Sequence, residues 1–188
     1  MVYDFNYKIL VCLVVISFFV IFFSKKRFNK DIKEIVALIL ICCYFILVIS
    51  KTQFPIFINN STMESELGGI KFGRDINLIP FKDFAHMTSL LNIMMFIPIG
   101  FLQGFVVKND WKKSIIGGII LSLIVESLQL LVNVFVGYNF RTFDINDLIF
   151  NTIGALLGYL ILYGLSVFLK KVLKENNNGI IEYIKLRC

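Results

Sequence analysis

The sequence predicts an all-α fold, a polytopic bundle of about five transmembrane helices with the N-terminus outside and the C-terminus in the cytoplasm. Its 188 residues are 57% hydrophobic and only 17% charged, whereas soluble domains are about 25% charged. A soluble domain of this length could not bury so much apolar surface. The apolar residues also form separate runs near the roughly 20 residues that span a bilayer. These observations exclude an ordinary soluble enzyme and a disordered protein.

Five apolar runs are candidate spans, and they cover residues 9–23, 35–50, 90–107, 114–136 and 148–169. The first run is the shortest and resembles a signal peptide in its position. Its basic cluster follows the apolar run instead of preceding it, and no small-residue cleavage site comes after it. Because this order is opposite to that of a cleaved signal, we expect a retained membrane anchor.

The predicted orientation rests on lysine and arginine in the connections. Most of the 19 basic residues fall in the loops 24–34 and 108–113 and in the tail from residue 170. Short loops rich in these residues stay in the cytoplasm. The net charge of +6 is therefore explained by topology, which predicts anionic lipid headgroups as partners and no nucleic acid.

The same spans divide the chain into four parts. Residues 1–51 hold two N-terminal spans with a basic cytoplasmic loop, and residues 52–89 form an extracellular loop with an interfacial helix. Residues 90–169 form a three-span core, and residues 170–188 form a basic cytoplasmic tail. Pro80 suits the first turn of the interfacial helix. One apolar face would follow, formed by Phe81, Phe84, Ala85 and Thr88. The alternative is a plain lead-in to the third span.

The single histidine and the cysteines predict no chemistry. His86 has no partner pattern of a catalytic triad or a metal site, so we expect a solvated or interfacial histidine. The four cysteines are Cys12, Cys42, Cys43 and Cys188. Their spacing is not that of metal ligands or of a disulfide framework. We therefore expect no metal and no cofactor.

Polar residues recur inside the fourth span, where lipid should surround the chain. Glu126, Gln129 and Asn133 stand at i, i+3 and i+7, so they share one helix face. A helical rise of about 1.5 Å per residue places Glu126 close to mid-membrane. An unpaired carboxylate there would take up a proton or find a cation.

The next loop and the start of the fifth span supply further charges. Asp144 is a natural N-cap, and Asp147 falls in the first helical turn, where the helix dipole favours negative charge. Asn151 lies on the same face. Arg141 can reach inward to Glu126, clamp the two aspartates, or hold an anionic ligand bidentately.

These residues predict one outward-facing polar pocket between the last three spans, since ionisable groups within spans usually face a bundle interior. Its members are Asn92, Glu126, Gln129, Arg141, Asp144, Asp147 and Asn151. The alternative is purely architectural, with amides and carboxylates bonded across helices. Small residues would allow those helices to approach closely, and Pro98 removes one helical hydrogen bond. The packing candidates are Pro98, Gly100, Gly154 and Gly158.

Three blocks together resemble the VanZ-like family. The first is the loop motif 77–81 with Asn77, Pro80 and Phe81, the second is 92–102, and the third runs from Glu126 through 141–147 to residue 155. The family pattern often has a second aspartate where this chain has Asn146. This departure would weaken a divalent-cation site, although an asparagine oxygen can still be a ligand.

The resemblance implies a multi-pass membrane protein of a Gram-positive bacterium, linked to the cell envelope and to glycopeptide resistance, teicoplanin in particular. Three classes of function remain open. The first is a non-enzymatic protein whose pocket binds an envelope lipid, a wall precursor or the glycopeptide. The second is an integral membrane enzyme acting on an envelope lipid, for which no catalytic residue is predicted. The third is a structural scaffold; a small transporter ranks below these.

Overall fold

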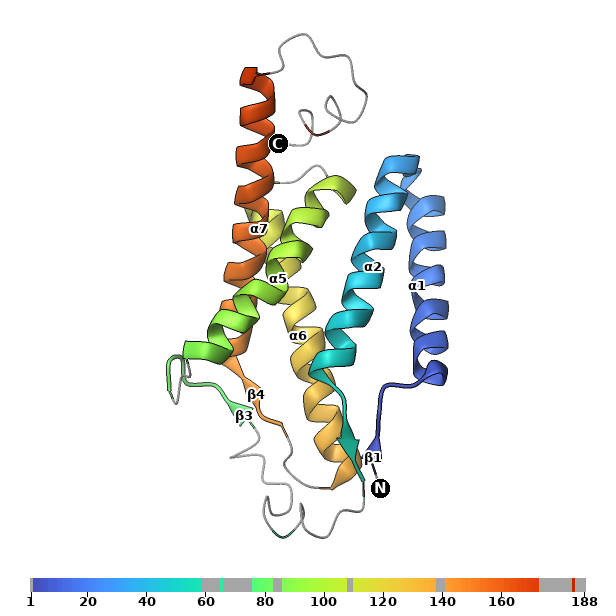
Figure 1. Cartoon of the computed structure of the whole chain (residues 1–188), viewed down its shortest axis with the longest axis vertical. Coiled ribbons are helices and arrows are strands. Elements are labelled where there is room, and N and C mark those ends of the chain that lie inside the picture. The colour runs from blue at the N-terminus through green and yellow to red at the C-terminus, as the bar shows by residue number, and fades with distance from the viewer. Residues whose placement is uncertain are drawn as a thin grey trace.

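The protein is a bundle of five long helices with short strands at one end (Figure 1). The computed structural model describes residues 2–58, 65, 76–82, 86–107, 110–137, 141–172 and 184. The helices are α1 (Tyr7–Phe28), α2 (Ile32–Thr52), α5 (His86–Val106), α6 (Trp111–Val136) and α7 (Ile145–Val172). Each is long and apolar enough to cross a membrane. The predicted all-α, multi-pass fold with five spans is therefore confirmed.

The two ends of the bundle differ in chemistry. Strand β1 (Val2–Tyr3) pairs antiparallel with β2 (Ile56–Phe57), and β3 (Ile76–Asn77) pairs parallel with β4 (Phe143–Asp144). We call this the strand end; the N-terminus also lies there (Figure 1). The opposite end, called the basic end, carries the basic last turns of α1 and α7. Those turns contain Lys25, Lys26, Arg27, Lys170 and Lys171.

Capping residues fix where the helices begin and end. Asn6 caps α1, because its side chain accepts hydrogen bonds from the backbone N–H groups of Lys8 and Ile9. Asp110 caps α6 in the same way through the N–H of Lys113, at 2.9 Å. Helix α6 ends at Gly137, whose φ of 85° lies in the left-handed region that glycine tolerates. These caps bring each apolar run to a definite end.

Helices α5 and α7 pack backbone against backbone. A Cβ at Gly100 would overlap the carbonyl oxygen of Ala155, and one at Gly158 would overlap that of Ile97. Gly154 faces the carbonyl of Ile93 in the same manner. Such close approach gives van der Waals contact that lipid cannot replace. Helix α5 continues through Pro98 without interruption.

The apolar core lies where α2, α5, α6 and α7 meet. Phe96, Ile99 and Ala155 are fully buried, and Tyr44 of α2 packs against them. The Tyr44 hydroxyl donates a hydrogen bond of 3.0 Å to the carbonyl of Met95. Helix α1 differs from the other four, because it has no buried residue and packs chiefly against α2.

The predicted interfacial helix does not begin at Pro80. Residues 80–82 form a turn, and Phe81 has a φ of 62°, which a helical first turn excludes. Phe84 and Ala85 lie outside the described residues, and Thr88 belongs to α5. The turn is held by tertiary hydrogen bonds that periodicity in the sequence does not reveal.

Candidate functional site

The deepest charged group of the site is Glu126 of α6, which is only 1% exposed. Its Oε2 accepts a hydrogen bond of 3.3 Å from the backbone N–H of Asp144. This contact joins the middle of α6 to the strand that precedes α7. A carboxylate buried to this degree among apolar helices is costly to ionise without further compensation.

The second carboxylate, Asp147, links α7 to α5. The Asn92 side chain of α5 donates a hydrogen bond of 2.6 Å to Asp147 Oδ1. Asp147 stands in the first turn of α7, where backbone N–H groups point toward it. Both residues are half-buried. The short distance fits a charge-assisted hydrogen bond to an ionised carboxylate.

The third carboxylate, Asp144, occupies the position before α7. Its Oδ1 accepts hydrogen bonds from the Asn146 N–H at 2.8 Å and from the Asn77 amide at 3.1 Å. Asn77 also pairs with Asp144 through the parallel ladder of β3 and β4. Asp144 therefore caps α7 and anchors the loop motif of residues 77–81 to the start of that helix.

Asn146, which departs from the resembled pattern, holds the turn at residues 80–82. Its Oδ1 accepts a hydrogen bond of 2.6 Å from the N–H of Phe81, and its Nδ2 donates one of 3.1 Å to the carbonyl of Lys82. The side chain is 3% exposed. An aspartate could not donate to that carbonyl, so the amide is what this turn requires.

The three carboxylates have described hydrogen bonds that do not involve the guanidinium of Arg141. Their hydrogen bonds come from amide side chains and backbone N–H groups. Arg141 is positioned through its main chain, because its N–H donates to Asn133 Oδ1 at 2.9 Å and its carbonyl accepts from Asn133 Nδ2. Burial lowers the pKa of the Arg141 guanidinium. Of the three predicted roles, binding of an anionic ligand is the one that we take forward.

Asn151 lies one helical turn after Asp147 on α7 and extends the network farther along that helix. It is 1% exposed, and its Nδ2 donates a hydrogen bond of 2.9 Å to the hydroxyl of Ser122 on α6. Among the described residues, Asn151 Oδ1 has no hydrogen-bond partner. Ser122 was not a predicted member, since a lone serine in an apolar run gives no distinctive signal.

Gln53, at the end of α2, is a second member that the sequence does not reveal. It is 3% exposed, and its Nε2 donates a hydrogen bond of 3.3 Å to the carbonyl of Val125, next to Glu126. Its Oε1 is buried and makes no hydrogen bond to a described residue. A polar residue just after a span is normally interpreted as interfacial, so only tertiary structure reveals its burial.

Gln129 stays outside the network. It is half-buried and forms no hydrogen bond within the described part of the chain. The three polar residues on one face of α6 therefore differ in their surroundings. Glu126 and Asn133 are buried and hydrogen-bonded, while Gln129 lies at the border of the network. His86, the first residue of α5, is exposed.

The assembled site, called here the polar network, combines carboxylates with amide, hydroxyl and guanidinium groups. It contains three carboxylates and the guanidinium donors of Arg141, and two of its buried amide oxygens, those of Gln53 and Asn151, have no described donor. The described residues offer no group of three acidic, histidine or cysteine side chains arranged to hold a metal ion. The arrangement can therefore accept hydrogen bonds from a donor-bearing ligand or take up protons.

A comparison with known families places this geometry in context. The family model described as VanZ/LLP1 matches residues 35–169. The match covers α2, α5, α6 and α7, which contribute every member of the polar network that lies on a helix, and it leaves out α1. No curated protein and no solved structure matches the chain.

Proposed function

Because the chain belongs to the VanZ/LLP1 family, we propose that this multi-pass membrane protein acts in the bacterial cell envelope by binding a lipid or wall-related ligand at the polar network. The observation that carries the proposal is the burial of Glu126 beside Asp144 without a cationic partner among the described residues. Ionisable groups kept inside spans usually serve a ligand, an ion or a proton.

The ligand would present hydrogen-bond donors to the network. Carboxylate oxygens and the orphaned oxygen of Asn151 are acceptors. Envelope lipids, wall precursors and glycopeptides carry hydroxyl, amide or amino groups that can donate to them. Arg141, which is half-buried at the strand end, would bind an anionic group of the same ligand.

The strand end would face the outside of the cell. Supporting this orientation, the basic last turns of α1 and α7 share the opposite end of the bundle. Basic connections stay in the cytoplasm. The polar network would then meet ligands on the outer side, where glycopeptides act, and lowered susceptibility to teicoplanin would be one outcome of that binding.

A matched pair of variants tests this function. Glu126→Gln replaces an ionisable carboxyl with an amide but keeps an oxygen that can accept the Asp144 N–H. Asp4→Asn makes the same chemical change at an exposed residue near the same end. Teicoplanin susceptibility is measured in a bacterium that expresses each variant at equal membrane levels, and the purified variants are assayed for binding of teicoplanin and of a lipid-linked wall precursor.

We expect Glu126→Gln to lose both protection and ligand binding, and Asp4→Asn to retain both. Thermal unfolding in detergent shows whether Glu126→Gln remains folded. If the folded Glu126→Gln protein binds and protects as the wild type does, the network has only an architectural role and the proposal is wrong.

A further inference from the structure

A groove runs between α2 and α5 at the basic end, remote from the strand end. It has a volume of about 400 Å³, within the range of about 300–1,000 Å³ that is usual for ligand sites. Its walls are apolar and come from both helices. They include Val36, Ala37 and Leu40 of α2, and Phe101, Leu102 and Phe105 of α5.

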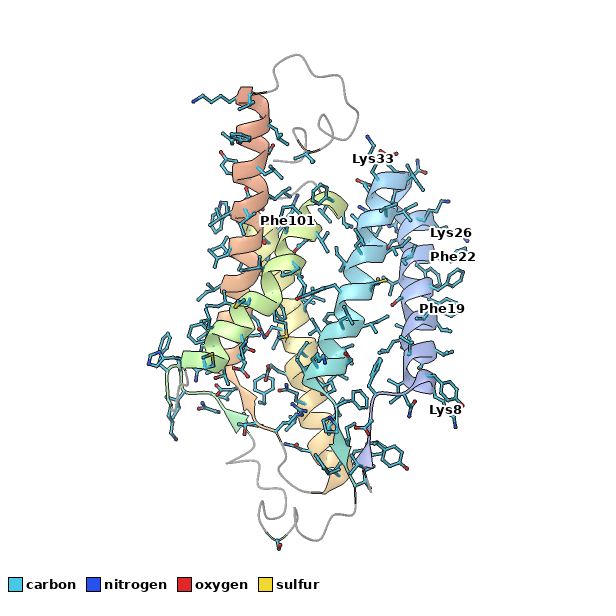
Figure 2. The ribbon with its side chains drawn as sticks, in the orientation of Figure 1. Lys8, Phe19, Phe22, Lys26, Lys33 and Phe101 are labelled. Carbon is cyan, nitrogen blue, oxygen red and sulfur yellow. The ribbon has the colours of Figure 1, made fainter. Side chains whose placement is uncertain are left out.

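One charged side chain completes the lining. Lys33 lies in the first turn of α2, so it stands at the basic end of the groove. Figure 2 shows Lys33 at this end of the bundle and Phe101 on α5 farther from that end, near the level of Lys26. The groove therefore has a cationic mouth and an apolar interior.

A neighbouring lysine fixes the two walls relative to each other. Lys30 donates a hydrogen bond to the carbonyl of Val106 at the end of α5 and forms an ion pair of 3.8 Å with Glu34. Lys30 is thus committed to joining α2 and α5. Lys33, in the first turn of α2, is exposed and places a positive charge at the mouth of the groove.

An exposed tryptophan lies at the same end of the bundle as the mouth of the groove. Trp111, the first residue of α6, is 52% exposed at the same end, and tryptophan is enriched at membrane–water interfaces. The last turn of α1 adds further basic residues there. A molecule in the groove would have its apolar part among Leu40 and Phe101 and its polar part beside Lys33.

We propose that this groove is a specific site for an anionic phospholipid, with one acyl chain between α2 and α5 and the phosphate beside Lys33. The apolar walls match an acyl chain, and Lys33 at the mouth matches a negative headgroup. Basic pockets between transmembrane helices on the cytoplasmic side bind anionic headgroups in this way. The inference is independent of the ligand at the polar network.

Competition between two lipids tests the site. The full chain in nanodiscs of phosphatidylcholine is titrated with phosphatidylglycerol of matched acyl chains, and bound lipid is counted by native mass spectrometry. Lys33→Gln removes the charge at the mouth, and Val36→Trp fills the groove. The matched controls are Lys171→Gln on α7 and Val14→Trp on α1, which alter residues of similar exposure elsewhere.

We expect the wild type to retain phosphatidylglycerol in preference to phosphatidylcholine. Lys33→Gln should weaken that preference about fivefold, which is the effect of one lysine near an anionic headgroup. Val36→Trp should abolish retention of both lipids, and both controls should behave as the wild type. Helical content by circular dichroism verifies that all four variants fold.

Three results would overturn the site. Equal losses in Lys33→Gln and Lys171→Gln would mean that lipid senses only the overall charge. Undiminished retention in Val36→Trp would mean that the groove holds no acyl chain. A dimer that dissociates in Val36→Trp would mean that a second copy of the chain covers the groove instead.

Discussion

Asn92 of α5 and Asp147 of α7 meet in a hydrogen bond of 2.6 Å, although 55 positions separate them in the chain. The bond crosses the same interface at which glycine residues bring the two helices together. The hydrogen bond and the close packing of α5 on α7 therefore depend on each other, because Asn92 reaches Asp147 only where the two backbones lie close together. Removal of either feature should disturb the other.

Replacing Asn92 with alanine should destabilise the protein by about 1 kcal/mol, a typical value for a hydrogen bond between transmembrane helices. The free energy of unfolding in detergent measures the loss. Gln129→Ala is the control, because Gln129 forms no hydrogen bond to the described residues. An equal effect of both substitutions would show that the bond contributes nothing specific.

Gly158→Ala should destabilise the bundle by about 1–3 kcal/mol, because its new methyl group meets the carbonyl of Ile97 and forces α5 and α7 apart. Gly164→Ala is a matched control on the same helix, since nothing lies within 4 Å of its Cβ position. There alanine should stabilise the helix slightly. Thermal unfolding of the two variants should therefore shift in opposite directions.

Gln53→Glu should make stability depend on pH. Burial at this position would raise the folded-state pKa of the new carboxyl above its usual value of about 4.3. The destabilisation caused by the buried negative charge should be complete above the folded-state pKa, where the carboxyl is ionised in both the folded and the unfolded protein. It should disappear below about pH 4.3, where both states hold the proton. Unfolding free energies measured across this range test the prediction.

Gln53→Leu is the uncharged control for that titration. It removes the donor to the Val125 carbonyl and also the orphaned Oε1, so its stability relative to the wild type should not change with pH. A constant difference between the glutamate variant and the wild type would contradict burial of this side chain.

The orientation of the bundle can be measured directly by cysteine labelling. In a chain whose four native cysteines are replaced by serine, Asp4→Cys at the strand end should react with a membrane-impermeant maleimide on intact cells. Lys26→Cys at the basic end should react only after the cells are opened. Both residues are exposed, so the reverse pattern would mean that the strand end faces the cytoplasm.

The spans could be predicted from the sequence because membrane insertion depends on local hydropathy. All five apolar runs are helices, and capping residues such as Asn6 and Asp110 mark where two of them begin. The capping position of Asp144 is likewise a local property, because it depends on the residues directly before and within the first turn of α7.

The remaining part of the site depends on contacts distant in sequence. The burial of Gln53 requires α2 to end beside Val125 of α6. The turn at Phe81 requires Asn146 to bond on both sides of it. Helical periodicity around Pro80 favours a helix, but the structure satisfies these backbone groups by tertiary bonds instead. No local pattern contains that information.

Helix α1 buries no residue within its own chain, so most of its surface is left for lipid to cover. Substitutions on its exposed faces should be tolerated whenever they keep the segment apolar, because α1 is packed chiefly against one neighbouring helix, α2. Such a segment can drift rapidly during evolution without loss of the bundle. A family match that begins only at residue 35 is what this freedom would produce.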